Sequence, residues 1–425
     1  VAARPDDIEN LRDLASGAPV VRAVNDLIEK AIDMRASDIH VEPFRSGLVV
    51  RMRIDGMLRI VPAPTLIVPE AIISRIKILA SLDIAERRLP QDGAARVRIG
   101  ASDIDMRVAT MPRQHGEAAV IRLLPRDRGL LDIKKLGLSP PDERKLSRLL
   151  ELPHGLVAVT GPTGSGKTTS LATMLSILND PSRKILTIED PVEYEIEFVN
   201  QSQVKPSIGL TFATAMRAFV RQDPDVIMVG EIRDRETAEI AVEASLTGHL
   251  VLSTLHTNSA AETITRLLDM GMDPFNFGDS LLAVLAQRLV RRCCSQCQTR
   301  GPLEGPELDE LLADYLHVFP NDARPTEDAV LAEWRDAYAQ DGKFVRYQST
   351  GCDACGGTGH RGRAGLHELL RVTPGIRRQI QTGARAEEIL HTALGDGLRT
   401  LRQDGILKVL QGITTLAEVR ATSNA

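Results

Sequence analysis

Short apolar runs separated by helical spacing dominate the middle of the chain. The runs fall at 156–160, 185–188, 226–229 and 250–253, and the segments between them carry apolar residues three and four positions apart. Strands that alternate with helices predict a parallel sheet covered on both faces, with ligands at the carboxyl ends of the strands. The pattern therefore predicts an α/β domain over residues 142–290.

The first part of the chain has a different pattern. Apolar positions recur at helical spacing from Val20 to Ile32 and again over 72–82. Alternating runs flank the turn signal Asp55-Gly56, which predicts a hairpin, and two further strand-like runs come later. Together these elements predict an α+β domain over residues 18–124.

Composition divides the rest of the chain. Residues 1–17 are polar and 125–141 are rich in charge, Gly and Pro, so both segments are interpreted as linkers. Residues 303–343 carry eleven acidic and three basic side chains, which predicts an acidic, partly helical insertion with a small apolar cluster of its own. This insertion lies inside a cysteine-containing module at 291–366, and 367–425 has the pattern of a compact set of helices.

A glycine-rich motif follows the first apolar run of the middle domain. It reads Gly161-Pro162-Thr163-Gly164-Ser165-Gly166-Lys167-Thr168 and opens a helical pattern that continues through Thr169. The glycines let successive backbone N–H groups point at an anion, and the helix N-terminus adds partial positive charge. Lys167 can reach the β- and γ-phosphates, and the Thr168 hydroxyl can coordinate Mg²⁺. Because a bare turn does not need Lys-Thr at these positions, the motif predicts binding of a nucleoside triphosphate.

Acidic side chains follow two of the buried runs. The second run leads to Glu189, Asp190 and Glu193, and the third leads to Glu231. Two carboxylates at adjacent strand ends can hold Mg²⁺ with its waters and activate an attacking water. Glu189 or Asp190 alone could equally cap a helix or stay on the surface. Glu193 and Glu231 together with the phosphate loop indicate catalysis.

Cationic side chains provide candidate partners for the phosphates. Arg217 and Arg221 lie one helical turn apart and so share a helix face. A guanidinium at the γ-phosphate stabilises the transition state of phosphoryl transfer, and salt bridges to nearby acids are the alternative. His249 and His256 flank the fourth apolar run. A histidine there could bind the γ-phosphate or cap the strand end, and His256 is the stronger functional candidate.

Composition narrows the class of protein. The chain has 425 residues, a net charge of −5 and 3% aromatic residues. This balance argues against a nucleic-acid coat protein and against base-stacking surfaces. We find no apolar run of about 18 residues, no signal peptide and no lipidation motif, so membrane contact is expected only through partners or a peripheral surface. The chain begins with Val, which suggests N-terminal trimming.

Five cysteines cluster in the last third of the chain. Four of them form the pairs Cys294-X-X-Cys297 and Cys352-X-X-Cys355, a spacing typical of a tetrahedral zinc site with four thiolates. Nucleotide chemistry without a signal peptide indicates a reducing cytoplasm, where such pairs bind metal rather than form disulfides. Cys293 is left over and is interpreted as a small apolar residue.

Taken together, the motifs resemble those of the secretion ATPases, the motors of type II and type IV secretion and of pilus assembly. The phosphate loop and residues 188–194, 230–234 and 247–257 are similar to that family's Walker A, Asp, Walker B and His boxes. Residues 35–42 and 51–56 are similar to the domain that precedes the motor. The resemblance spans almost the whole chain. It implies a RecA-like P-loop core with an N-terminal PAS-like α+β domain, a tetracysteine zinc module and a C-terminal helical domain.

The resemblance also implies roles for individual residues. By position, Glu193 matches the family's general base and Glu231 its Walker B acid. The other positions expected to face the nucleotide are Arg107 and Arg122 in the N-terminal domain, and Arg217, Arg221, Arg233, His249 and His256 in the motor domain. The family further implies a homo-hexamer with active sites between the N- and C-terminal domains, which move on hydrolysis.

The cysteine pairs narrow the position within the family. A tetracysteine module followed by residues 359–363 and 365–368 resembles type II secretion and pilus-extension ATPases, whereas retraction ATPases generally lack it. The 54 residues between Cys297 and Cys352 are more than the resemblance leads us to expect, because the acidic insertion occupies the gap. We interpret the insertion first as a solvated helical embellishment and second as a docking surface.

We therefore predict a hexameric ATPase of the type II secretion system that drives pseudopilus assembly and protein export across the outer membrane. We expect ATP, Mg²⁺ and Zn²⁺ as cofactors, no nucleic acid, and a cytoplasmic location with attachment to inner-membrane platform proteins. A type IV pilus-extension ATPase is the nearest alternative. A nucleotide-gated scaffold and a zinc-containing nucleic-acid translocase are weaker ones, because Glu193 and Glu231 are intact and aromatic residues are scarce.

Overall fold

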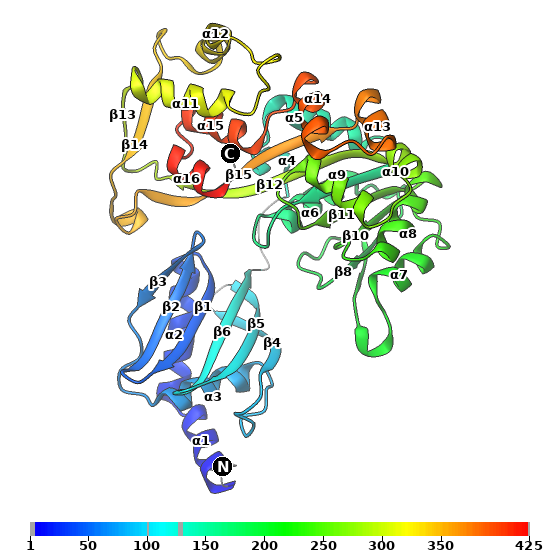
Figure 1. The fold of residues 1–425 in the computed structure, drawn as a ribbon. Coiled ribbons are helices and arrows are strands. Elements are labelled where there is room, and N and C mark those ends of the chain that lie inside the picture. The colour runs from blue at the N-terminus through cyan, green and yellow to red at the C-terminus, as the bar shows by residue number, and fades with distance from the viewer. Residues whose placement is uncertain (1–4, 100–101, 126–130, 424–425) are drawn as a thin grey trace. The chain divides into compact units, whose positions relative to one another are not determined.

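The chain folds into two compact units, Val1–Gly129 and Leu130–Ala425. The computed structural model describes residues 5–99, 102–125 and 131–423, and Figure 1 traces them. Each unit contains a sheet of its own. The boundary between the units falls in the segment predicted as the second linker, of which residues 126–130 lie outside the described residues.

The N-terminal unit is built on a six-stranded antiparallel sheet with strand order β3-β2-β1-β6-β5-β4. Its elements are α1 (Pro5–Ser16), α2 (Ala18–Asp33), β1 (Ala36–Phe44), β2 (Gly47–Ile54), β3 (Met57–Val61), α3 (Pro69–Leu79), β4 (Gln91–Ile99), β5 (Ser102–Arg113) and β6 (Gly116–Pro125). The predicted hairpin is confirmed as β2 and β3. Alternate residues such as Ile39 and Met52 join α2 and α3 in the core, while Asp38 and Arg122 fall on the other side of the strands.

The segment 1–17 was predicted to be a linker, and this is wrong for its described part. Residues Pro5–Ser16 form α1, and Ala15 at its end is fully buried. The helix carries mostly polar side chains, so its apolar positions are too few to produce a clear stripe in the sequence. The second predicted linker is also shorter than expected, because α4 (Ile133–Leu136) and the start of α5 (Pro140–Leu150) lie within 131–141.

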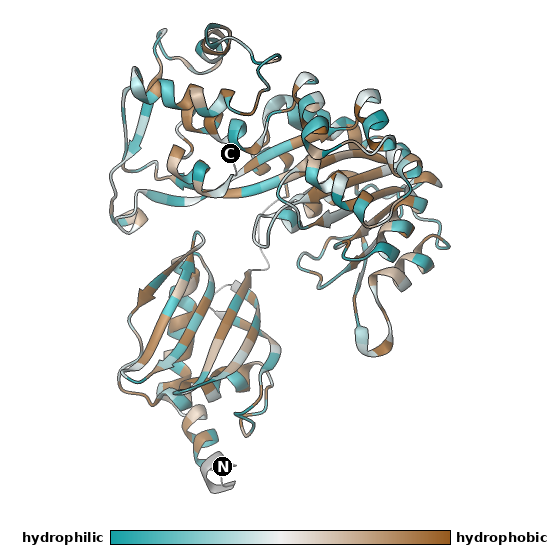
Figure 2. Ribbon diagram, viewed as in Figure 1, coloured by the Kyte–Doolittle hydropathy of each residue, from teal (hydrophilic) through white to brown (hydrophobic). Residues whose placement is uncertain are grey.

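The C-terminal unit is built on a seven-stranded sheet with strand order β15-β12-β7-β11-β10-β8-β9. All neighbouring strands are parallel except β12 and β15, which are antiparallel. The strands are β7 (Gly155–Thr160), β8 (Ile185–Glu189), β9 (Asn200–Gln203), β10 (Val226–Val229), β11 (Leu250–Leu255), β12 (Leu281–Cys293) and β15 (His360–Arg371). The four strands predicted from apolar runs are β7, β8, β10 and β11, and Figure 2 shows hydrophobic residues concentrated in this sheet.

Helices cover both faces of this sheet, as the alternating pattern predicts (Figure 1). One face packs against α5 and α6 (Lys167–Leu178). The other packs against α7 (Phe212–Phe219), α8 (Arg235–Leu246), α9 (Ala260–Asp269), α10 (Pro274–Ser280), α13 (Pro374–Gln381) and α14 (Ala386–Gly395). The predicted α/β class is therefore confirmed.

The expected boundaries at residues 290 and 366 fall inside paired strands. β12 crosses the first and β15 crosses the second, and β15 is part of the central sheet. Ile376 and Ile389 of the C-terminal helices share one buried cluster with Val229 and Val251 of the central strands. Residues 130–425 therefore form one compact unit rather than a motor domain followed by separate parts.

The acidic insertion packs against the last helices of the chain. It contains α11 (Pro306–Leu316) and α12 (Glu327–Tyr338), between β13 (Gln298–Pro302) and β14 (Val345–Ser349), and it lies against α15 (Leu401–Leu410) and α16 (Leu416–Thr422). The rings of Tyr315 and Trp334 meet edge to face with centroids 5.2 Å apart. Arg420 Nε donates to Asp314 Oδ2 at 2.8 Å, and Arg402 Nη1 donates to the same oxygen at 2.9 Å. Part of the acidic charge is thus neutralised within the unit.

No helix in the described ranges combines the length and apolar character needed to cross a lipid bilayer.

Candidate active site

The phosphate loop joins β7 to α6 at the carboxyl edge of the parallel strands. Gly161, Gly164 and Gly166 have φ angles of 154°, 81° and 89°, in the region that favours glycine. In the described part of the chain, the amides of Thr163, Gly164 and Gly166 donate to no backbone carbonyl. A curled loop with such amides at a helix N-terminus is suited to an anion, so these residues fit the phosphates of a nucleotide.

Lys167 lies within this loop, at the first position of α6. Its Nζ donates to the carbonyl oxygens of Gly161 at 2.7 Å and Pro162 at 3.0 Å. Burial, together with repulsion from Arg288, lowers the pKa of Lys167 to about 8, although the charge of Glu231 acts in the opposite direction. A phosphate beside Nζ would supply the opposite charge that the buried ammonium needs.

Glu231 and His256 converge on Lys167 from neighbouring strands. Glu231 lies just after β10, and His256 lies directly after β11. His256 places Nδ1 at 3.4 Å from Lys167 Nζ and Nε2 at 3.5 Å from Glu231 Oε2. Arg233 Nη2 donates to Glu231 Oε1 at 2.5 Å and lies 3.9 Å from Asp190 Oδ2. The loop and the ends of two strands therefore bring a cation, an imidazole and a carboxylate into one cluster.

The segment that carries Glu193 is fastened to the phosphate-loop helix. Tyr194 Oη and Thr169 Oγ1 are 2.8 Å apart. Gln201 of β9 donates through Nε2 to the Tyr194 carbonyl at 2.7 Å and to Glu189 Oε2 at 2.9 Å. These contacts hold the half-buried Glu193 beside the start of α6. Gln201 was not predicted, because a polar residue in a short edge strand has no distinctive sequence signal.

Glu189 has a structural environment rather than a catalytic one. Its side chain is buried at the end of β8, where Thr187 Oγ1 also donates to Oε2, at 2.8 Å. Burial raises the pKa of Glu189, while the Thr187 and Gln201 donors oppose this shift. The carboxyl group is thus held inside the sheet edge, which leaves Asp190, Glu193 and Glu231 as the acids available to a ligand.

Three predicted residues of the motor domain do not join this cluster. Arg217 of α7 pairs with Glu236 of α8, and Arg221 Nη1 lies 3.4 Å from the Arg217 carbonyl oxygen. His249 precedes β11, whereas the phosphate loop lies beyond its other end. The six residues of β11 span about 20 Å, and His249 Nδ1 contacts the Ala244 carbonyl at 2.9 Å. His249 is therefore distant from the phosphate loop of its own subunit, and that it binds nucleotide stays a prediction.

Arg107 and Arg122 lie opposite each other on β5 and β6 of the N-terminal unit. Arg122 Nε donates to Asp38 Oδ1 at 3.0 Å, and Arg53 Nε lies 4.0 Å from Asp38 Oδ2. Asp38 is thereby held between two guanidinium groups on one face of the sheet. That Arg107 and Arg122 face a nucleotide stays a prediction.

The four paired cysteines gather into one cluster, with all Sγ atoms within 4.8 Å of one another. Cys352 Sγ lies 3.9 Å from Cys294 Sγ and 3.8 Å from Cys355 Sγ. Tetrahedral Zn²⁺ with Zn–S bonds of about 2.3 Å requires sulfur separations of about 3.8 Å, so the arrangement fits zinc. The amide of Gly351 donates to Cys297 Sγ at 3.3 Å, as expected around a thiolate. Cys293 is buried and outside this set, in agreement with its predicted apolar role.

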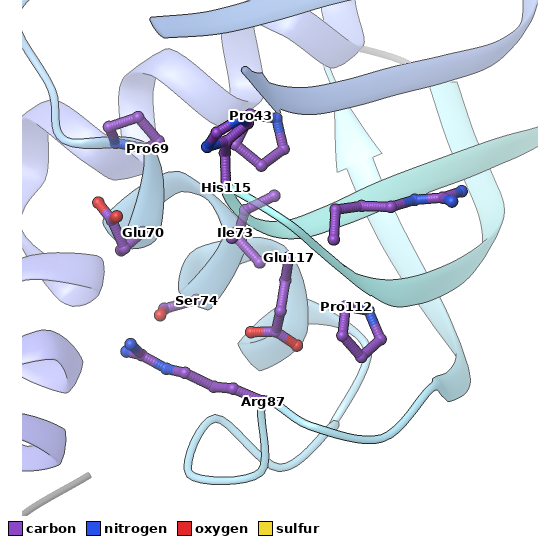
Figure 3. Close-up of a pocket in the computed structure, with 11 residues that line it drawn as sticks. Pro43, Pro69, Glu70, Ile73, Ser74, Arg87, Pro112, His115 and Glu117 are labelled. Atoms are coloured by element: carbon purple, nitrogen blue, oxygen red, sulfur yellow. The ribbon is translucent and has the colours of Figure 1, made fainter. Parts of the chain in front are cut away.

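A separate cavity of about 160 Å³ lies in the N-terminal unit (Figure 3). It is lined by three prolines and by charged side chains that include Glu70, Arg87 and Glu117. Glu117 forms a buried ion pair with Lys77. None of the residues predicted from the sequence to bind nucleotide or metal lines this cavity, so it belongs to a different part of the molecule from the phosphate loop.

Comparison with known proteins identifies the family. The sequence profile of the family described as Type II/IV secretion system protein matches residues 13–421. The chain belongs to this family. Among its members, Type II secretion system protein E of Dickeya dadantii is 47% identical over 97% of this chain and 77% of the relative. Type II secretion system ATPase E of Vibrio cholerae is 45% identical over 97% of this chain and 76% of the relative.

Solved structures of the type II/IV secretion family agree with this fold. The pilus retraction motor PilT with bound ADP has a TM-score of 0.62 and 27% identity, over 94% of this chain and 97% of the other. The Legionella pneumophila ATPase DotB has a TM-score of 0.64 over 93% of each chain, and at 21% identity it supports the fold alone. The predicted family resemblance is therefore confirmed.

Proposed function

We propose that this chain is the ATP-hydrolysing motor of a type II secretion system, acting as a homo-hexamer to drive pseudopilus assembly and protein export. The observation that carries the proposal is the cluster of Lys167, His256 and Glu231 beside a loop shaped for phosphates. The relatives named for type II secretion supply the biological process. The four-cysteine cluster, which we assign to structural Zn²⁺, accompanies this assignment.

Each residue of the site has its own role in phosphoryl transfer. The loop amides and Lys167 hold the β- and γ-phosphates. Thr168, exposed at the start of α6, and Glu231 are placed to hold Mg²⁺, which when bound neutralises charge on the phosphate oxygens. Glu193 takes a proton from the attacking water, and its segment is held in place by the Tyr194–Thr169 contact. His256, between Lys167 and Glu231, is positioned to respond to the presence of the γ-phosphate.

Four of the predicted arginines lie outside the cluster around Lys167 and would have to reach the nucleotide from another subunit or domain. Arg217 on α7 and Arg221, two residues after this helix, make contacts within the subunit. We therefore assign them, with Arg107 and Arg122, to an active site that is completed when subunits and domains close on the nucleotide. On this view an isolated subunit binds ATP but hydrolyses it slowly, and attachment to inner-membrane platform proteins brings the cytoplasmic ring to its place of action.

The test is the ATPase rate per subunit measured against protein concentration, with mass measured in parallel. We expect the rate per subunit to rise as the hexamer forms. Glu193→Gln should leave MgATP binding intact and lower turnover by at least about tenfold, because the amide cannot accept the proton. Glu239→Gln, an exposed acid on α8, is the matched control and should keep normal turnover. Near-normal turnover of Glu193→Gln would show that another group is the base.

A further inference from the structure

The phosphate loop rests on a side chain that none of its own motifs contains. Gln287 lies on β12, one residue beyond Ala286, which pairs with Thr160 at the end of β7. Gln287 Nε2 donates to the Ser165 carbonyl at 2.8 Å, and Ser170 Oγ donates to Gln287 Oε1 at 2.6 Å. One end of the amide therefore binds the phosphate loop, and the other binds the helix α6 that follows it.

Gln287 also limits the shape that the loop can take. A Cβ atom on Gly166 would lie 2.7 Å from Gln287 Nε2, and one on Gly161 would lie 2.5 Å from the Gln287 carbonyl oxygen. The contact at Gly161 is with backbone, so glycine there is required by the neighbouring strand as well as by its φ angle. At Gly166 the contact is with the end of a side chain that can move, and the φ angle is what favours glycine. The loop is pressed against β12 rather than standing free in solvent.

The same strand holds a second nucleotide-facing segment from its opposite face. Successive residues of a strand point to opposite faces, so Arg288 lies on the side of α9. Arg288 Nη2 donates to the Asn258 carbonyl at 2.9 Å. On β15, Glu368 Oε1 accepts from the Ala260 amide at 2.8 Å, and Oε2 accepts from the Leu401 amide at 3.2 Å. Asn258 and Ala260 immediately follow the segment that contains His256.

A buried glutamine in an apolar strand has an energetic cost that packing does not explain. Gln287 is 3% exposed, and its neighbours on β12 are mainly Ala, Leu and Val. Burying an amide is unfavourable unless its groups are hydrogen-bonded, and an apolar residue would pack equally well. The partners of Gln287 are Ser165 of the phosphate loop and Ser170 of α6. Its hydrogen bonds therefore stabilise the position of the loop at the start of the helix.

We infer that Gln287 is a positioning residue for nucleotide binding: it holds the phosphate loop in its anion-binding shape, while Arg288 and Glu368 hold the segment after His256 in register with it. This inference rests on the proposed ATPase function and adds β12 and β15 to the parts that build the site.

The experiment measures the Kd for MgATP and the melting temperature of the full chain and its variants. Gln287→Met keeps the volume but removes both hydrogen bonds, and we expect the Kd to rise by about tenfold or more. Gln287→Glu should weaken binding further at pH 8, because a carboxylate repels the Ser165 carbonyl and the phosphates. Ser170→Ala removes one of the two hydrogen bonds and should raise the Kd by about threefold.

The matched control is Gln403→Met on α15. Gln403 is 1% exposed and hydrogen-bonded to the Thr400 amide and the Tyr315 carbonyl, away from the loop. We expect it to lower the melting temperature but to leave the Kd unchanged. If Gln287→Met folds and binds MgATP like the native chain, or if Gln403→Met weakens binding equally, the inference is overturned. Should Gln287→Met fail to fold, an unchanged Kd for Ser170→Ala overturns it. Failure of the native chain to bind MgATP would instead refute the proposed function itself.

Discussion

The phosphate loop and the cysteine cluster are both binding regions, but their shapes have different origins. The loop is held by hydrogen bonds from protein side chains. Lys167 donates to the Gly161 carbonyl, and Gln287 of β12 donates to the Ser165 carbonyl. The cysteine segment also has hydrogen-bond donors, since backbone amides reach two of the sulfur atoms and the Ser349 and Thr358 hydroxyls reach cysteine carbonyls. Its four sulfur atoms, however, lie at the spacing that a tetrahedral metal ion requires. The loop is thus preorganised by the fold, whereas the proposed zinc would hold together four thiolates that otherwise repel one another.

Because of this difference, we expect loss of the nucleotide and loss of the metal to affect the protein in different ways. A ligand that binds a preformed site adds stability only by mass action, so its removal leaves the fold intact. A structural metal contributes folding free energy directly, because its site does not exist in the unfolded chain. Mutations in the loop should therefore change affinity, and mutations in the cluster should change structure.

The largest effect is expected from Cys297→Ser. Loss of one thiolate should release zinc and destabilise residues 291–366, since structural zinc contributes on the order of 10 kcal/mol to small modules. Metal analysis and hydrogen exchange over this segment would measure both effects. Cys293→Ser is the matched control: this buried cysteine lies outside the cluster, so zinc should be retained. Finding no zinc in the native protein would contradict the proposal that the four cysteines bind a structural metal.

The next effect in size is expected from Lys167→Ala. Removal of the ammonium should weaken MgATP binding by about a hundredfold, because charge-assisted hydrogen bonds to phosphate are among the strongest in proteins. The melting temperature without nucleotide should change little, since the neighbouring contacts of the loop remain. Lys184→Ala removes a lysine that contacts the Gln222 carbonyl and should bind normally. Calorimetric titration would compare the three proteins, and unchanged affinity of Lys167→Ala would refute the loop assignment.

The smallest effect is a pH dependence that belongs to the loop alone. The pKa of Lys167 is lowered from 10.5 to about 8, so the free protein loses this proton at lower pH than the unfolded chain does. Stability without nucleotide should therefore rise between about pH 8 and pH 10.5. MgATP affinity should fall over the same window, by about tenfold at pH 9. Lys167→Arg stays charged throughout and should show no such fall; an identical decline in both proteins would assign the titration elsewhere.

Much of the central sheet could be predicted because its signals are local. The run Val226–Val229 is bounded by Asp225 and Gly230, and β10 has the same limits. The phosphate loop and its helix were found for the same reason, since the motif specifies both ligand and context. The spacing within each cysteine pair likewise predicts a metal site, even though 54 residues lie between the two pairs.

Other features depend on contacts that sequence spacing does not contain. Gln287 supports Ser165 from 122 positions away, so no local pattern marks it. His249 and His256 were both candidates because they flank one apolar run, but that run is a strand that separates them. β15 was divided between two expected domains, because its pairing with β12 joins residues more than 65 positions apart.

The continuity of β12 has a mechanical consequence. The strand runs past the end of β7 to Cys293, so the support of the phosphate loop and the residue directly before Cys294, the first cysteine of the cluster, belong to one continuous strand. Six residues lie between Gln287 and Cys294, which corresponds to about 20 Å along an extended chain. A tilt of about 5° at the sheet would swing its far end by about 2 Å. Angular changes too small to disturb the core would thereby become displacements at the tip.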